Sequence, residues 1–130
     1  MNDLECMNLA KTYLQFKPTG KSQKWDAKEF WEATKAGKGI ESPFGFMVAQ
    51  YEFRTTWTHW ECHPKGDELL IAIEGSMQLV LEIDGKETMV ALEAPSAFLV
   101  PAGTWHSGNV AKPCRVIGIS AGEGTMNRPR

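Results

Sequence analysis

The chain has 130 residues, of which 42% are hydrophobic and 23% are charged. This length suits one domain with a sizeable core, and the composition is that of a globular protein, which excludes a disordered or fibrous chain. The formal net charge is -2 at pH 7, so the sequence offers no broad basic surface for nucleic acid or an anionic membrane.

Residues 1–42 are expected to form an N-terminal arm followed by one short helix. Residues 1–25 show weak patterning, and we expect no secretory signal in them because a charged segment followed by an apolar one is missing. A helix is predicted over residues 26–36, since Asp26 suits the N-cap, Glu29 follows three residues later, and Gly37 suits a left-handed stop. No apolar run approaches the roughly 20 residues that a membrane helix needs.

Short strands are predicted after residue 43, where apolar and polar residues alternate with a period of two. Asp84 and Gly85 are typical of a tight hairpin between two of these strands. The predicted strands cover residues 46–53, 68–73, 76–83, 86–92, 97–100, 106–110 and 114–120.

Many short strands and a single helix predict an all-β fold, either a sandwich or a barrel. We expect the barrel to span residues 43–120 and residues 121–130 to form a C-terminal tail. The tail contains the sequence GEGT, which lacks the lysine and the helix that follow a phosphate-binding loop, so a turn is predicted there.

The stretch HWECHPKGDE, residues 59–68, concentrates side chains that bind metals. If the strand that begins at residue 46 continues towards His63, its odd-numbered side chains share one face, and Cys62 lies on the other. That face carries Trp57, His59, Glu61 and His63. A turn at residues 64–66 then brings Glu68, on the neighbouring strand, opposite His63 and Glu61.

A further histidine follows the turn PAGTWH, where Pro101 and Gly103 present His106 at the start of a strand. Two imidazoles and two carboxylates suit a divalent first-row metal, because these donors are borderline to hard and no thiolate is needed. Taken singly, a histidine beside a glutamate is more often a hydrogen-bonded pair than a ligand. The joint spacing of the four residues is what favours a metal site.

These motifs resemble those of the cupins, a family of small barrel proteins. His63, Glu68 and Gly75 match the end of the first cupin motif, while Pro101, Gly103 and His106 match the core of the second. The likeness spans residues 43–120, and the phrases WECHPKGDELL, VPAGTWH and GEGTMNRP are similar to a small single-domain bacterial subgroup. The resemblance implies a double-stranded β-helix, or jelly-roll barrel, and a homodimer.

The sequence departs from the cupin pattern at a position that bears on the metal, because Glu61 stands where the first motif has its first histidine. The metal set that the resemblance implies is Glu61, His63, Glu68 and His106. Glu61 is then either the fourth ligand, favouring harder ions such as Mn²⁺ or Fe²⁺, or a catalytic base beside the ion. Two alternatives stay open: His59 replaces the missing imidazole, or the metal is lost and a buried hydrogen-bond network remains.

Two classes of function follow. One is an enzyme that uses a divalent ion (Fe, Mn, Ni or Zn) to act on a small organic molecule at the barrel mouth, by oxygenase, isomerase, lyase or decarboxylase chemistry. The other is a non-catalytic protein that binds a small ligand, with or without metal. Basic residues on the strands are few, Arg54 and Arg115 among them, which disfavours sugar phosphates.

The remaining aromatic and thiol side chains are predicted to be structural. We expect core packing for Tyr51, Phe53 and Trp57 in preference to a role in lining a cavity. Trp105 is expected to face away from the metal and to pack between the sheets. The three cysteines, Cys6, Cys62 and Cys114, are an odd number without C-x-x-C spacing, which indicates reduced thiols in a cytoplasm, with Cys62 and Cys114 buried.

Overall fold

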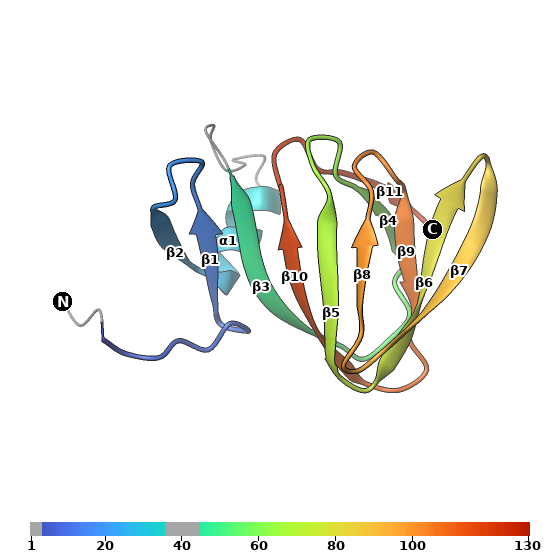
Figure 1. Cartoon of the computed structure of the whole chain (residues 1–130), viewed down its shortest axis with the longest axis horizontal. Coiled ribbons are helices and arrows are strands. Elements are labelled where there is room, and N and C mark those ends of the chain that lie inside the picture. Colours follow the sequence, from blue (N-terminus) through green and yellow to red (C-terminus); the bar gives the residue numbers. More distant parts are fainter. Residues whose placement is uncertain (1–3, 36–44) are drawn as a thin grey trace.

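The computed structural model describes residues 4–35 and 45–130 and confirms the predicted all-β architecture (Figure 1). Two antiparallel sheets enclose the core. The first sheet contains, in spatial order, β2 (Ser22–Asp26), β1 (Thr12–Phe16), β3 (Phe46–Phe53), β10 (Cys114–Ser120), β5 (Glu68–Glu74) and β8 (Ala97–Val100). The second contains β11 (Met126–Pro129), β4 (His59–Cys62), β9 (His106–Asn109), β6 (Ser76–Ile83) and β7 (Lys86–Glu93).

Helix α1 (Ala27–Lys35) confirms the helix predicted from the capping pattern. The Oδ2 atom of Asp26 accepts a hydrogen bond from the backbone N–H of Glu29 at 3.0 Å, as an N-cap does. The predicted helix end, at residues 36 and 37, lies outside the described residues. No helix in the described part of the chain is long and apolar enough to cross a membrane.

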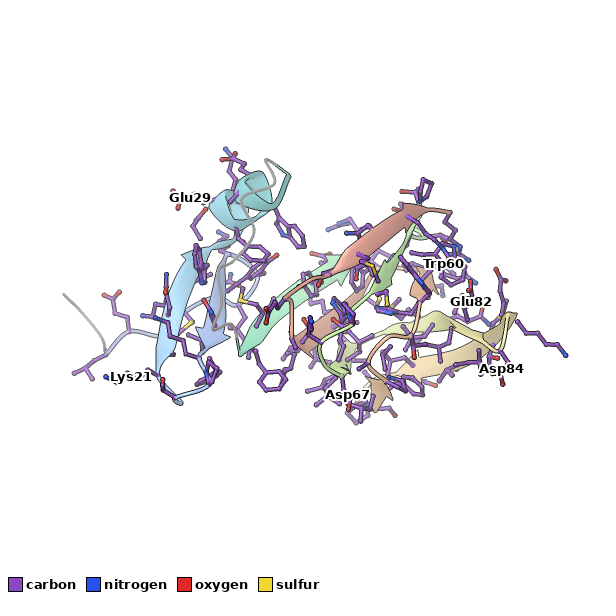
Figure 2. All side chains as sticks on the ribbon, turned by 90° about the horizontal axis from the view of Figure 1, so that it is seen from above. Lys21, Glu29, Trp60, Asp67, Glu82 and Asp84 are labelled. Atoms are coloured by element: carbon purple, nitrogen blue, oxygen red, sulfur yellow. The ribbon has the colours of Figure 1, made fainter. Side chains whose placement is uncertain are left out.

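The hairpin between β6 and β7 turns at the predicted pair of residues. Asp84 and Gly85 both have positive φ, 51° and 75°, which the twist of a tight hairpin requires. In Figure 2, Asp84 marks this turn, while Glu29 on helix α1 lies towards the other end of the molecule. The helix and the strands next to it therefore extend the molecule away from the hairpin.

Three strands occupy segments in which the sequence predicted no regular structure. β1 and β2 form a hairpin that extends the first sheet beyond β3, with Leu14 opposite Val48. β11 pairs with β4, with Asn127 opposite Glu61. Both ends of the chain thus contribute to the sheets that carry the candidate site.

The strand that begins at residue 46 does not continue to His63. β3 ends at Phe53, and the chain crosses to the other sheet before β4 begins. Hydrogen bonds near the end of β9 hold the crossing segment: the Trp57 N–H donates to the Gly108 carbonyl at 2.9 Å, and the Thr56 hydroxyl accepts from the Val110 N–H at 3.0 Å. The predicted pairing of Glu68 with a strand next to β4 is wrong as well, because β5 belongs to the facing sheet.

The hydrophobic core lies between the two sheets and draws on both. Its fully buried members include Leu79 on β6 and Val116 on β10, each with 0% of its surface exposed. Burying a side chain of this size stabilises the fold by about 1.5–3 kcal/mol. Cys62 and Cys114 are buried, as predicted, at 2% and 1% exposure.

Strand β11 is held by an arginine between two tryptophans. The Arg128 guanidinium lies 4.5 Å from the ring centre of Trp105 and 5.4 Å from that of Trp60, and it pairs with the Glu82 carboxylate. Glu82 alternates with the inward-facing Leu81, so this contact lies on the outer face of the second sheet. The prediction that Trp105 packs between the sheets is therefore wrong.

Candidate metal centre

Four side chains converge where the two sheets face each other. Ligand atoms of Glu61, His63, Glu68 and His106 all lie within 4.8 Å of one another. Glu61 on β4 stands directly opposite His106 on β9, and His63 follows the last residue of β4. Glu68 begins β5 and reaches the cluster from the facing sheet. The structure thus brings together all four side chains that the sequence singled out.

The separations within the cluster suit a single ion. The Nε2 atom of His106 lies 3.1 Å from Glu68 Oε1, and that of His63 lies 3.4 Å from Glu68 Oε2. Glu61 Oε2 lies 3.8 Å and 3.9 Å from the same two nitrogens. Ligands bound about 2.0–2.2 Å from one ion are themselves roughly 3–4 Å apart. These four separations therefore match those between ligands of a single ion.

Three atoms at the centre of the cluster are buried and have no hydrogen-bond partner among the described residues. They are His63 Nε2, His106 Nε2 and Glu68 Oε1. Leaving a buried polar atom unpaired costs about 1–3 kcal/mol, so three such atoms facing one another need a compensating cation. A bound metal ion would satisfy them, and so would a proton on a histidine Nε2, which lies 3.1 Å (His106) or 3.4 Å (His63) from Glu68.

Neighbouring groups fix the orientation of both imidazoles. His106 Nδ1 donates to the backbone carbonyl of Thr104 at 3.0 Å. His63 Nδ1 lies 2.8 Å from Thr125 Oγ1, and since that hydroxyl donates its own proton to the Gly122 carbonyl, its oxygen accepts from His63. Both Nδ1 atoms donate, so in the neutral ring the lone pair is on Nε2, which faces the cluster as in metal-binding histidines.

Sequence reasoning missed the role of Thr125. The turn predicted at GEGT is present, with the Thr125 N–H donating to the Gly122 carbonyl at 3.2 Å. Its contact with His63 joins residues 62 positions apart and depends on the pairing of β11 with β4. No local pattern in the sequence indicates that contact.

Glu68 and His106 each shift the pKa of the other. Burial alone would raise the pKa of Glu68, but contacts with His106 and His63 lower this pKa to about 2. Burial alone would lower the pKa of His106, but the adjacent Glu68 carboxylate raises it above its usual value. Glu68 is therefore an anion at neutral pH, ready to hold a cation.

Glu61 and His59 occupy the rim of the cluster. Glu61 turns Oε2 towards the two buried imidazoles, while its Oε1 lies 3.2 Å from Nε2 of His59. The His59 side chain is 42% exposed, and its ring stacks on Trp57 with the planes 5° apart. The structure thus places the Glu61 carboxylate, and not the His59 ring, within the group of ligand atoms.

A cavity of about 920 Å³ opens beside the four side chains. Tyr51, Phe53 and Trp57, which were predicted to be core residues, all line it. Tyr51 and Phe53 lie at the end of β3, and Trp57 lies in the segment that crosses from the first sheet to the second. The metal cluster therefore forms one part of the wall of a space large enough for a small organic molecule.

Solved structures of similar shape identify the fold. A cupin-2 domain-containing protein from Shewanella frigidimarina NCIMB 400 matches with a TM-score of 0.51 and 18% identity, over 72% of this chain and 76% of that one. The chain has the cupin fold. Hydroquinone 1,2-dioxygenase from Sphingomonas sp. TTNP3 matches this cupin fold with a TM-score of 0.51 and 15% identity, over 58% of each chain. Hydroxypropylphosphonic acid epoxidase from S. wedmorenis does so with a TM-score of 0.51 and 12% identity, over 58% of this chain and 43% of that one.

Comparison of the sequence with known proteins is less informative than comparison of the structure. No protein-family model matches the chain. The uncharacterized protein YdbB of Bacillus subtilis (strain 168) is 45% identical over 47 residues, which are 36% of this chain and 39% of YdbB. The matched part is thus well under half of that relative.

Proposed function

We propose that this cupin-fold chain binds one divalent first-row metal ion and acts on a small organic molecule held in the adjoining cavity. The ligands are Glu61, His63, Glu68 and His106. The observation that carries the proposal is the group of three buried, unpaired atoms that face one another at the centre of the cluster. Two imidazole nitrogens and two carboxylates suit Fe, Mn, Ni or Zn, and the second carboxylate favours Mn²⁺ or Fe²⁺.

Glu61 has two roles open to it in this proposal. Its Oε2 atom faces the buried imidazoles and is placed to complete the ligand set. Alternatively, its partly exposed carboxylate serves as a base that accepts a proton from a molecule in the cavity, while His59 holds the other oxygen. When bound, the ion supplies a Lewis acid that polarises an oxygen of such a molecule or of water.

Binding without turnover is the second candidate function. The aromatic side chains that line the cavity favour it, because they offer a surface to a ligand whether or not a reaction follows. The two candidates differ in one observable, which is the appearance of a product when the metal-loaded protein is incubated with a molecule that it binds.

Elemental analysis of protein grown with ample metal and purified without chelator tests the metal centre. We expect about one ion per chain in the wild type and its loss in His63→Ala and in His106→Ala, with circular dichroism as the check on folding. His59→Ala is the matched control, since it removes the third histidine of the chain and should keep the ion. A metal-free wild type, or metal retained in both other variants, would contradict the proposal.

We also propose a homodimer formed through the first sheet. Five aliphatic side chains lie in register across five strands on the outer face of this sheet: Leu14, Val48, Ile119, Leu69 and Leu99. Among these five side chains, Leu99 has 53% of its surface exposed. A second copy, which carries the same apolar row, would cover it. Each of the three cysteines is free, which supports a reducing compartment such as the cytoplasm for this dimer.

Sedimentation at micromolar concentration tests the dimer. The double variant Leu69→Lys/Leu99→Lys should be monomeric, because it places two charges within the apolar row. Met89→Lys, at an exposed position on the other sheet, is the control that should remain dimeric. A monomeric wild type would contradict the proposed dimer.

A further inference from the structure

Aromatic rings form an unbroken run along the cavity. The rings of Tyr51, Phe53, Trp57 and His59 follow one another with centroid separations of 5.7, 5.0 and 5.3 Å. All four residues line the cavity, and we call them the aromatic wall. The wall ends at His59, which contacts the Glu61 carboxylate. A flat molecule that lies along the wall therefore has one end beside the metal cluster.

The charges that line the cavity are mostly negative. Four glutamates, Glu52, Glu61, Glu68 and Glu123, are among the lining residues, and Arg54 is the sole lysine or arginine among the described ones. The Arg54 guanidinium already lies 2.8 Å from the Glu52 carboxylate. A divalent ion on Glu61 and Glu68 would balance those two charges only. No lysine or arginine among the described lining residues is left over to hold an anionic group.

We propose that the cavity binds an aromatic-ring compound that carries no negative charge and rejects carboxylates and phosphates of the same shape. Ring stacking against the aromatic wall supplies the attraction. An anion would meet carboxylates in a partly desolvated space, where the repulsion between like charges is stronger than in water. This inference rests on the proposed function in one respect, namely that the bound ring is the molecule presented to the metal.

Three compounds with the same ring test the charge preference: benzyl alcohol, benzylamine and benzoate. Binding to the full chain is measured by calorimetry and by tryptophan fluorescence, both on protein as purified and after metal removal. We expect the alcohol and the ammonium form of the amine to bind at least about tenfold more tightly than benzoate. Benzoate binding as tightly as the other two in metal-free protein would overturn the proposal. Since this arm needs no ion, its failure is distinguishable from failure of the metal centre.

Two pairs of variants locate the effect. Phe53→Leu should weaken binding of benzyl alcohol several-fold. Phe46→Leu should leave it unchanged, because Phe46 is the exposed first residue of the same strand and does not line the cavity. Glu52→Gln should strengthen benzoate binding because it releases Arg54, whereas Glu74→Gln breaks the ion pair with Arg115 outside the cavity and should have no effect. Equal effects within either pair would show that the probes bind somewhere else.

Discussion

The Nε2 atom of His106 lies 3.1 Å from Oε1 of Glu68, yet neither atom has a hydrogen-bond partner. His106 donates its Nδ1 proton to the Thr104 carbonyl, so a neutral ring turns a lone pair towards an anion. Two acceptors at this distance repel each other unless a cation comes between them. A metal ion fills that need, and without one a proton on Nε2 does, which is why the pKa of His106 is raised.

A proton and a metal ion compete for Nε2 of His106, so the affinity for the metal should depend on pH. The ion needs the Nε2 lone pair of His106, so binding should weaken as the pH falls through the raised pKa of this residue. Calorimetry in two buffers of different ionisation enthalpy should show about one proton released per ion below that pKa, and none above it. Binding without proton release across about pH 5–8 would mean that His106 is not a ligand.

The metal-free protein should be most stable in a defined pH window. The pKa of Glu68 is lowered from 4.5 to about 2, so its contribution is complete above 4.5 and is lost as the pH falls towards 2. The pKa of His106 is raised from 6.5, so its contribution is complete below 6.5 and is lost as the pH rises through the higher value. Urea unfolding should therefore show the pair at full strength between 4.5 and 6.5, with Glu68 adding on the order of 3 kcal/mol.

Glu68→Gln is the check on that window. The variant removes the carboxylate that shifts the pKa of His106, so the unfolding free energy should lose the part of its pH dependence that the Glu68–His106 pair contributes. Glu87→Gln, an exposed residue of β7, is the control and should keep the wild-type profile. A Glu68→Gln profile identical to that of the wild type would assign the pH dependence to other groups.

Thr125 should act on the metal through His63. Removing the hydroxyl in Thr125→Val frees Nδ1 of His63 and should weaken metal binding about 10–100-fold, whereas Thr125→Ser should keep it. Thr88→Val, at an exposed site on β7, controls for the loss of a hydroxyl elsewhere. Equal affinity in Thr125→Val and the wild type, measured by competition with a chelating dye, would leave the hydroxyl as part of the turn alone.

Glu61→His separates the two roles of Glu61. If the carboxylate is a ligand, a third imidazole in its place should shift the preference from Mn²⁺ or Fe²⁺ towards Zn²⁺ or Ni²⁺. Metal content and affinity after growth with each metal give the comparison. Unchanged metal identity and affinity would show that Glu61 does not touch the ion and would favour its role as a base.

Much of the fold follows from local pattern. Alternation places β3 and β6 at their observed bounds, and the pair Asp84 and Gly85 places the hairpin. β2, with the sequence SQKWD, is exposed at four of five positions and shows no buried face, so its pairing with β1 is not visible locally. Residues 54–58 include three β-branched threonines, which favour a strand. The segment crosses between the sheets instead, held by hydrogen bonds to residues at the end of β9 that the local sequence does not indicate.

For the candidate site too, the sequence predicted some features and missed others. The spacing of His63, Glu68 and His106 identified residues that do meet, because short strands and tight turns fix where each side chain points. It did not give the sheet to which Glu68 belongs, nor the contact of Thr125, since both depend on pairing between distant segments. The aromatic wall escaped prediction for a related reason: alternation gives the face of a strand but not whether that face is filled or hollow.

Gly108→Ala should narrow the cavity without disturbing the metal. A Cβ atom at this position would lie 2.4 Å from Cε of Met77 and 3.2 Å from the Trp57 ring. The methionine methyl can move aside, but the tryptophan is stacked on His59 and packed against Phe53, so it would shift as part of the aromatic wall.

We expect a loss of about 1–3 kcal/mol in unfolding free energy and weaker binding of benzyl alcohol, with the metal content unchanged. Adding Met77→Leu removes the nearest clash and should recover stability but not ligand affinity. If the double variant recovers both, the glycine is needed only to accommodate Met77, and Trp57 is not what Gly108 positions.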